Sequence, residues 1–178
     1  TTTINGLSYY KLIELQAKNP FNYYFSDTIA VDGHIGLALD VVDQIDNQPF
    51  KFGVYKITLK VDNEIEYLVS YDTYRFEDAQ FIYTERDYSL KQETGKQFYR
   101  LFNNHQNENL LFTDKSNSAG QIFSDNSFHK IEILVEDYYH NEISIKGVVL
   151  HQKLPNVIMN HDRQNKIISF ERDSLFEL

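Results

Sequence analysis

The chain has no cysteine and no tryptophan, and only seven glycines and three prolines among its 178 residues. The absence of cysteine excludes disulfides, thiolate metal ligands and thiol nucleophiles, although it does not fix the compartment. With glycine this sparse, a backbone cradle for phosphate is not expected. The phosphate-binding loop, the dinucleotide fingerprint and the G-x-S-x-G nucleophile motif are all missing. The lack of tryptophan weakens the expectation of a sugar-binding platform without excluding it.

Basic residues are also in short supply. The chain has 17 Lys and Arg against 26 Asp and Glu, which gives a formal net charge of -9. The basic residues are scattered, whereas nucleic acid as a partner would require them to cluster. No apolar run approaches the roughly 18 residues that span a bilayer, so no transmembrane segment is expected. The first residues lack a methionine and the basic start and apolar core of a signal peptide, which predicts a processed protein or an excised segment.

Short segments of alternating apolar and polar residues are what the chain has in plenty. Hydrophobic residues make up 42% and aromatic residues 15%, which is enough for the core of one domain. The strongest alternation runs over residues 33–67. It predicts a strand over residues 34–43, a second strand over residues 54–61, and a tight turn at Asp62 and Asn63. The return strand is predicted over residues 64–71.

A second alternating unit lies towards the end of the chain. Residues 128–137 and 142–150 alternate cleanly, and the polar segment 137–141 between them predicts a hairpin turn. The intervening chain is less regular, with a helical turn predicted within residues 77–85 and an exposed loop over residues 113–120. Residues 8–18 fit either one face of a helix or one face of a strand, and the flanking aromatic residues favour the strand. Further short strands are predicted at residues 28–31, 97–102, 110–112, 155–159 and 167–170.

Short strands separated by polar turns, with little helix, predict an all-β fold. The expected architecture is an antiparallel immunoglobulin-like β-sandwich with an irregular insertion and extra flanking strands. We expect residues 33–150 to form the sandwich and residues 1–32 to be an N-terminal extension that packs on it. Residues 151–178 are expected to be a linker and the start of a further β-segment.

Two groups of residues carry candidate chemistry. Asp40, Asp43 and Asp46 surround one loop together with Asn47, and calcium prefers such oxygen ligands. No EF-hand spacing is present, and loop Asp and Asn residues more often form turns, which is the favoured interpretation. A Ser-His-Asp triad assembled from distant positions cannot be recognised in a sequence, and it is not expected here.

The second group consists of three tyrosine doublets, Tyr9-Tyr10, Tyr23-Tyr24 and Tyr138-Tyr139. On a strand, one ring of each doublet points outward unless both faces are covered. Exposed tyrosines stack on sugars or anchor protein interfaces. The favoured interpretation is that a second layer or a neighbouring domain covers them, because tyrosine is commonly half buried.

Several short motifs occur in a characteristic order: Gly33-His-Ile-Gly36, Gly53-Val-Tyr55, Arg75-Phe76, Asp87-Tyr88, Tyr99-Arg-Leu-Phe102 and Asn109-Leu110. Residues 36–62 and 131–141 resemble bacterial immunoglobulin-like modules, although Tyr139 and His140 stand where such modules often carry small residues. The ordered series over residues 27–150 resembles the β-rich, non-catalytic part that follows the peptidase domain in bacterial envelope M23 (LytM-like) metallopeptidases. Residues 168–171 also resemble the start of a further β-module of such proteins.

The resemblance brings no catalytic residue with it. The peptidase domain of that family needs zinc ligands that include an H-x-x-x-D and an H-x-H motif, and catalytic zinc requires three protein ligands. No histidine of the chain has an Asp four residues on or a His two residues on; the six are His34, His105, His129, His140, His151 and His161. No catalytic, metal-binding or cofactor-binding residue is therefore assigned.

The leading hypothesis is a non-catalytic β-sandwich module of a bacterial cell-envelope protein. By resemblance it would be extracytoplasmic, in the periplasm or at the outer membrane. It would contact an adjacent domain or a protein partner, as an accessory to an M23-like peptidoglycan peptidase. Two alternatives stay open: a module that binds glycan or peptidoglycan through exposed tyrosines, and an enzyme whose site is discontinuous in the sequence.

Overall fold

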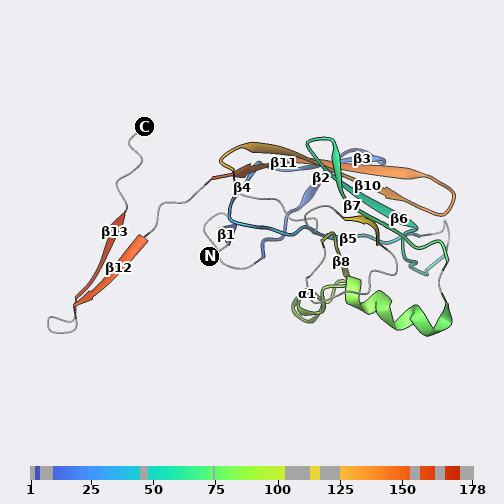
Figure 1. The fold of residues 1–178 in the computed structure, drawn as a ribbon. Coiled ribbons are helices and arrows are strands. Elements are labelled where there is room, and N and C mark those ends of the chain that lie inside the picture. The colour runs from blue at the N-terminus through green and yellow to red at the C-terminus, as the bar shows by residue number, and fades with distance from the viewer. Residues whose placement is uncertain are drawn as a thin grey trace.

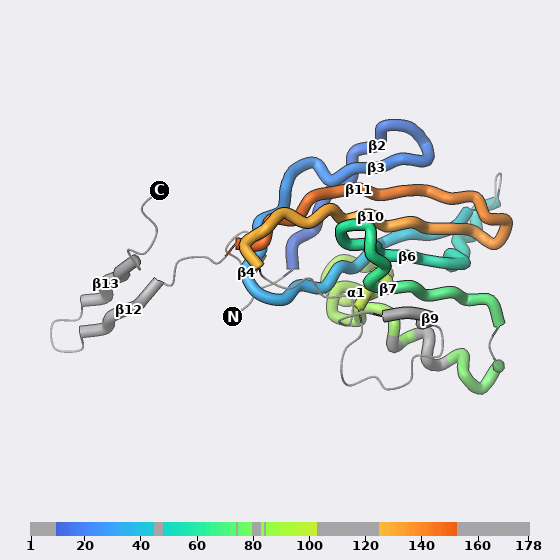
Figure 2. Tube along the Cα trace, turned by 45° about the horizontal axis from the view of Figure 1, so that its top comes forward, coloured from blue at the N-terminus to red at the C-terminus, as the bar shows by residue number. Residues whose placement is uncertain are grey.

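The structure is a computed structural model that describes residues 3–4, 10–44, 48–73, 75–102, 113–116, 125–152, 157–162 and 167–172. Most of the described chain is β-strand, with one α-helix and one 3-10 helix, which confirms the all-β class. Nine strands form the largest sheet, in the order β1-β4-β11-β10-β6-β7-β9, with β3 also beside β11 and β2 beside β3. Figure 2 shows β3, β11, β10, β6 and β7 side by side.

A long hairpin forms the centre of this sheet. β10 (Phe128–Glu136) and β11 (Glu142–His151) pair antiparallel from Phe128↔Leu150 to Glu136↔Glu142. Alternate side chains of both strands are buried, because successive residues of a strand point to opposite faces of the sheet. The predicted hairpin over residues 128–150 is therefore confirmed.

A second hairpin continues the sheet. β6 (Lys56–Val61) pairs with β10, and β7 (Glu64–Ser70) pairs with β6, both antiparallel. Asp62 and Asn63 between them have φ angles of 50° and 72°. Tight two-residue hairpin turns require this left-handed backbone, which Asp and Asn tolerate better than most residues. Both strands and the turn agree with the prediction.

The N-terminal strands make the sheet mixed. β3 (Asn22–Phe25) and β4 (Ile29–Asp32) both run parallel to β11, along two different stretches of it. β2 (Leu15–Asn19) pairs with β3, and β1 (Thr3–Ile4) pairs with β4. The prediction of wholly antiparallel strands is therefore wrong, because strands that are distant in sequence from β11 are free to pair with it in either direction.

The opposite edge of the sheet also differs from the prediction. β9 (Thr113–Ser116) pairs antiparallel with β7. The exposed loop predicted over residues 113–120 is wrong for these four residues, since the edge of β7 offers unpaired backbone groups that a neighbouring segment can satisfy. Residues 117–120 and the strand predicted at residues 110–112 lie outside the described residues.

A smaller layer covers one face of the sheet (Figure 1). It contains the pair β5 (Ala38–Asp40) and β8 (Phe98–Arg100), together with the 3-10 helix η1 (Phe76–Glu85) and α1 (Tyr88–Thr94). The helical turn predicted within residues 77–85 is confirmed by η1, whereas α1 was not predicted. The strand predicted over residues 34–43 is reduced to β5, followed by an isolated bridge at Asp43.

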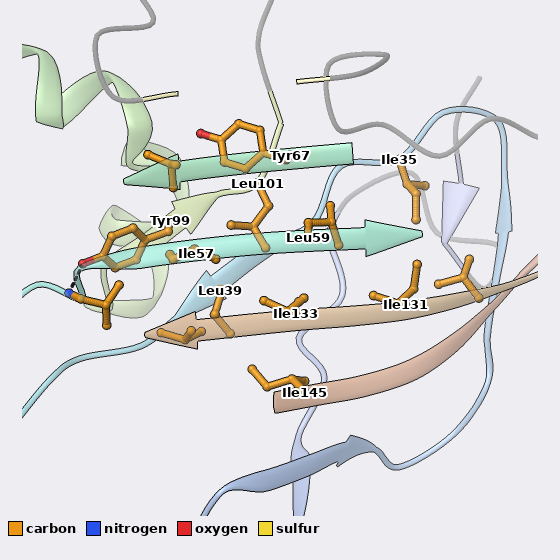
Figure 3. Close-up of a cluster of buried hydrophobic side chains, with 14 of the residues drawn as sticks. Ile35, Leu39, Ile57, Leu59, Tyr67, Tyr99, Leu101, Ile131, Ile133 and Ile145 are labelled. Carbon is orange, nitrogen blue, oxygen red and sulfur yellow. Dashed lines mark hydrogen bonds between the residues drawn. The ribbon is translucent and has the colours of Figure 1, made fainter. Parts of the chain in front are cut away.

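The core lies between the two layers (Figure 3). Its large fully buried side chains include Ile57, Leu59, Tyr67, Leu101 and Ile131. Apolar contact across the layers is the main source of stability in such an arrangement. The Tyr99 hydroxyl, also in the core, accepts a hydrogen bond from the Val54 backbone amide at 3.2 Å.

Ion pairs run along the other face of the central strands. Glu132 of β10 lies between Lys60 and Lys146, at 3.4 and 3.0 Å, and Lys56 pairs with Glu136 at 2.6 Å. The hydrogen bond from Lys146 holds the pKa of Glu132 below its usual range, against the effect of partial burial. This face is therefore polar, as half-buried antiparallel strands predict.

A separate hairpin follows β11 in the chain. β12 (Val157–Asp162) and β13 (Ile167–Arg172) pair antiparallel from Val157↔Arg172 to Asp162↔Ile167. The short strands predicted at residues 155–159 and 167–170 are confirmed where the structure describes them. Among the described residues, neither helix has the length and apolar character to cross a membrane.

Gly147 of β11 is required by the approach of Phe25. A Cβ atom at position 147 would lie 1.9 Å from Cδ2 of the Phe25 ring. We expect Gly147→Ala to lower the free energy of unfolding by about 1–3 kcal/mol, because added volume displaces the ring. In a Phe25→Ala background the same substitution should cost less. Urea denaturation of the four proteins measures the coupling, and strictly additive effects would contradict the contact.

Candidate functional site

Two histidines and two aspartates meet at one end of the core. His129, near the start of β10, is paired with Val149 of β11. The backbone N–H of His151, the last residue of β11, donates to the Ser127 carbonyl at 2.9 Å. The two histidines are therefore diagonal neighbours on the same face, with ring centroids 5.0 Å apart. The His151 side chain is fully buried, and that of His129 is 13% exposed.

Asp62 holds His129 from the β6–β7 turn. Its Oδ2 lies 2.7 Å from Nδ1 of His129, and its Oδ1 accepts the Lys130 backbone N–H at 2.8 Å. The Asp62 backbone N–H in turn donates to the Lys130 carbonyl at 2.9 Å. The left-handed turn and these three contacts fix the carboxylate beside the imidazole.

Asp125 approaches the other ring nitrogen from the segment before β10. Its Oδ1 lies 2.9 Å from Nε2 of His129. The same oxygen accepts the backbone N–H of Ser127 at 3.1 Å and the Ser127 hydroxyl at 2.7 Å. Asn126 between them has a φ of 60°. This local turn, typical of Asp and Asn, positions the carboxylate.

The electrostatics of the group follow from these contacts. Hydrogen bonds from Ser127 and His129 lower the pKa of Asp125 to about 2. Partial burial alone would raise the pKa of Asp62, but hydrogen bonds from the Lys130 amide and from His129 outweigh it and lower the pKa. Partial burial opposes charge on His129, yet hydrogen bonds to Asp125 and Asp62 raise its pKa above the ordinary value. Without a metal, the two carboxylates therefore favour the imidazolium form of His129 more than water does for a free imidazole.

The order of contacts has the connectivity of a Ser-His-Asp triad. The Ser127 hydroxyl lies 3.1 Å from Nε2 of His129, and Asp62 bonds Nδ1. However, the Ser127 hydroxyl is also 2.7 Å from Asp125, which offers it a carboxylate acceptor. A general base must accept the serine proton, and an imidazole held between two carboxylates retains its own. Serine hydrolysis is therefore not the function that this geometry favours.

A second polar group lies between the sheet edge and η1. The Tyr71 hydroxyl donates to Glu85 Oε2 at 2.5 Å, and the Arg86 guanidinium lies over the Tyr99 ring, 3.1 Å from its centroid. Burial raises the pKa of Glu85, against the lowering effects of Tyr71 and Arg86. None of these residues lines the open pocket of about 550 Å³ found between the β3–β4 connection and β10 and β11. We interpret the group as a structural link between the two layers.

Exposed aromatic side chains gather at the β10–β11 turn. Tyr138 is 69% exposed and Tyr139 is 83% exposed. Tyr138 meets both Tyr139 and Tyr55 edge to face, with centroids 5.8 and 5.7 Å apart, and Tyr55 meets His140 at 5.9 Å. We call Tyr55, Tyr138, Tyr139 and His140 the aromatic tip.

Asp137 fixes the backbone of the turn that carries Tyr138, Tyr139 and His140. Its Oδ1 accepts the backbone N–H groups of Tyr139 and Asn141 at 2.8 and 2.9 Å, and its Oδ2 accepts the Asn141 side-chain amide at 2.7 Å. His140 takes a φ of 64° within this turn. The sequence placed Tyr138 and Tyr139 in the turn, but the covering layer that it favoured is not found among the described residues.

The other predicted residues are distributed over the fold. Asp40 lies 3.4 Å from Lys96, and the backbone of Asp43 bridges to Phe52; Asp46 and Asn47 lie outside the described residues, so the calcium loop stays untested. In the first two tyrosine doublets, Tyr9 lies outside the described residues, and the Tyr10 hydroxyl donates to Glu93 at 2.6 Å. Tyr23 packs against the core, and Tyr24 lines the open pocket.

The His-Asp group was missed because the histidines were compared only at spacings of two and four residues. Asp125 stands four residues before His129, and His151 stands 22 residues after it. The predicted hairpin is enough to place the two histidines together. Folding residues 128–150 about the 137–141 turn brings positions 129 and 151 to one face of the sheet.

Comparison of the chain with protein-family profiles, with curated proteins and with solved structures found no match.

In metal-free protein, we expect Asp62→Asn and Asp125→Asn each to lower the pKa of His129. The contacts of charged His129 with the two carboxylates stabilise the fold fully below the ordinary pKa of 6.5. This stabilisation is lost as the pH rises through the raised pKa of His129 in the folded state. Both variants should therefore flatten the decline in stability that begins as the pH rises through about 6.5. Histidine ring signals in NMR titrations, with Asp78→Asn as a remote carboxylate control, measure the shift. An unchanged His129 pKa would contradict the contacts.

Proposed function

We propose that this chain is a non-catalytic β-module that contacts a protein partner or an adjacent domain through the aromatic tip. The observation that carries the proposal is the pair Tyr138 and Tyr139, exposed by 69% and 83% yet held in a fixed turn. Tyrosine is enriched at the energetic centres of protein interfaces, because it combines a large apolar ring with a hydroxyl that can hydrogen-bond.

The fixed backbone of the turn supports this interpretation of the aromatic tip. Binding costs free energy for every mobile side chain that becomes fixed, and a surface ordered beforehand avoids part of that cost. Asp137 orders the backbone of the turn. Tyr55, the residue before β6, contacts the Tyr138 ring edge to face and supports it. Charged neighbours frame the rings, since Glu136 pairs with Lys56 and approaches His140 at 3.4 Å. An aromatic centre with a charged rim is typical of a protein contact.

A protein surface suits the aromatic tip better than a glycan does. The Tyr138 ring is inclined at 84° to both Tyr55 and Tyr139, so neighbouring rings do not form one flat platform. Stacking on a sugar uses the face of a ring, and parallel rings would extend that face. The perpendicular rings instead present edges, faces and hydroxyls in several directions, which fits an irregular protein surface. Peptidoglycan binding is kept as the alternative outcome of the test.

The wider context of the proposal comes from the sequence. The ordered motifs over residues 27–150 support an accessory role beside an M23-like peptidoglycan peptidase in a bacterial envelope. For the same region we also propose the more specific immunoglobulin-like arrangement of the strands. Its support is the antiparallel run β7-β6-β10-β11 with the small β5–β8 layer over one face. The parallel strands β3 and β4 are additions to that arrangement.

Photo-crosslinking tests the contact in the cell that makes the protein. A photoreactive phenylalanine at position 139 should give a discrete adduct with one protein, and the adduct should be lost when Tyr138→Ser is added. Position 88 is the control, because Tyr88 is also an exposed tyrosine, at 69%, but lies in α1. The same probe at position 88 should give no such adduct.

Two results would contradict the proposal. The first is the absence of a discrete protein adduct at position 139 under conditions in which the variant folds and accumulates. The second is retention of the purified chain on peptidoglycan sacculi that is lost with Tyr138→Ser and Tyr139→Ser but kept with Tyr88→Ser. That pattern would assign the aromatic tip to glycan.

A further inference from the structure

We propose that Asp125, His129 and His151 form a binding site for a divalent metal ion of zinc type, with Asp62 as the residue that orients His129. One atom from each of the three potential ligands can be chosen so that all lie within 4.8 Å of one another. Two imidazoles and one carboxylate are donors that Zn²⁺ accepts, and three protein ligands leave one coordination position for water or a partner's side chain.

The distance between Asp125 and His129 suits a single small ion, and the His151 ligand atom lies within 4.8 Å of both. Ligand atoms around a tetrahedral zinc, at 2.0–2.1 Å from the metal, lie about 3.3 Å from one another. Nε2 of His129 and Oδ1 of Asp125 are 2.9 Å apart, so these two need to separate only slightly to share an ion. The His151 ring, with its centroid 5.0 Å from that of His129, completes the group from the neighbouring strand.

Asp62 supplies the support that metal-binding histidines usually have. In metal sites, the ring nitrogen that does not bind the ion commonly donates to a carboxylate, which fixes the ring and makes it a better ligand. Asp62 Oδ2 occupies this position at 2.7 Å from Nδ1 of His129 and leaves Nε2 on the side of Asp125. Asp62 is itself anchored by the Lys130 amide at 2.8 Å.

The proposed site combines a buried ligand with a ligand that is open to solvent. His151 is fully buried at the end of the core, whereas the Asp125 side chain is 51% exposed. An ion would therefore reach the group from solvent past Asp125 and meet ligands from separate segments, the turn before β10, β10 itself and the end of β11. Such an ion would tie these segments together and stabilise the folded chain.

The donors favour transition metals over Ca²⁺ and Mg²⁺. The last two prefer oxygen ligands in larger numbers, while imidazole suits zinc, copper, nickel and iron. A site with two histidines and one carboxylate also matches the ligand set of Fe²⁺ sites with open positions. Zn²⁺ and Co²⁺ are the probes of choice, because the visible spectrum of bound Co²⁺ distinguishes four-coordinate from six-coordinate geometry.

The inference is independent of the proposed function. We call Asp125, His129 and His151 the metal group. It lies where β10 begins and β11 ends, and the aromatic tip lies at the opposite end of the same hairpin. Loss of metal binding therefore leaves the contact through Tyr138 and Tyr139 untouched, and the reverse also holds. The two experiments can fail separately.

Calorimetric titration of the chelator-treated full chain with Zn²⁺ tests the site. We expect one zinc per chain, no heat with Ca²⁺ or Mg²⁺, and a higher melting temperature with zinc. His129→Gln should abolish binding, Asp125→Asn should weaken it at least tenfold, and Asp62→Asn should weaken it roughly 10- to 100-fold. Asp78→Asn, a carboxylate paired with Arg75 on η1, should leave the affinity unchanged.

The spectrum of bound Co²⁺ separates coordination from a merely structural role. The wild type should show the intense visible bands of four-coordinate Co²⁺, and Asp62→Asn should shift them while the protein remains folded by circular dichroism. If His151→Gln does not fold because His151 is fully buried, Asp125→Asn, at an exposed carboxylate, is the decisive variant. Absence of zinc binding in the wild type, or an affinity in His129→Gln and Asp125→Asn that equals that of the wild type, would overturn the proposal and leave an ion-pair group.

Discussion

The register of the β10–β11 hairpin is the constraint on which the rest of the structure depends. Side chains alternate between faces with a period of two, so a slip of one residue on either strand would move its apolar set to the solvent face. In the observed register Ile131, Ile133, Ile145 and Val149 all face the core. The same register brings the metal group together at one end and carries the aromatic tip at the other.

Aspartate side chains stabilise this register, two turns near it and the start of α1. Asp137 closes the turn at the tip, Asp125 shapes the turn before β10, and Asp62 joins the β6–β7 turn to Lys130. Asp87 plays the same part for α1, where its side chain accepts the Leu90 backbone N–H at 3.0 Å. Some of the acidic residues therefore have a structural role, because their carboxylates accept hydrogen bonds from backbone N–H groups at turns and at the start of a helix.

The local elements were predictable, whereas the long-range pairings were not. Alternation and turn residues predicted both central hairpins and the turn at Asp62. Helix α1 does have sequence signals, with Asp87 at its start and Gly95 after its end in a left-handed conformation. The parallel pairing of β3 and β4 with β11 and the addition of β9 to β7 depend on contacts between distant segments, which periodicity does not encode.

The candidate sites divide in the same way. Tyr138 and Tyr139 were identified from the sequence, since they stand in a predicted turn, but their exposure depends on what the rest of the fold leaves uncovered. His129 and His151 were within reach once the hairpin register was written out. Asp62 could not be placed beside them, because it belongs to a different hairpin and is brought close only by the pairing of β6 with β10.

Nuclear Overhauser contacts across the β10–β11 hairpin test its register most directly. For the metal-free wild type, we expect cross-strand backbone contacts between Ile133 and Ile145 and between His129 and Val149, together with ring contacts between His129 and His151. Contacts displaced by one residue would place His151 on the opposite face from His129. That result would contradict the core, the metal group and the aromatic tip together.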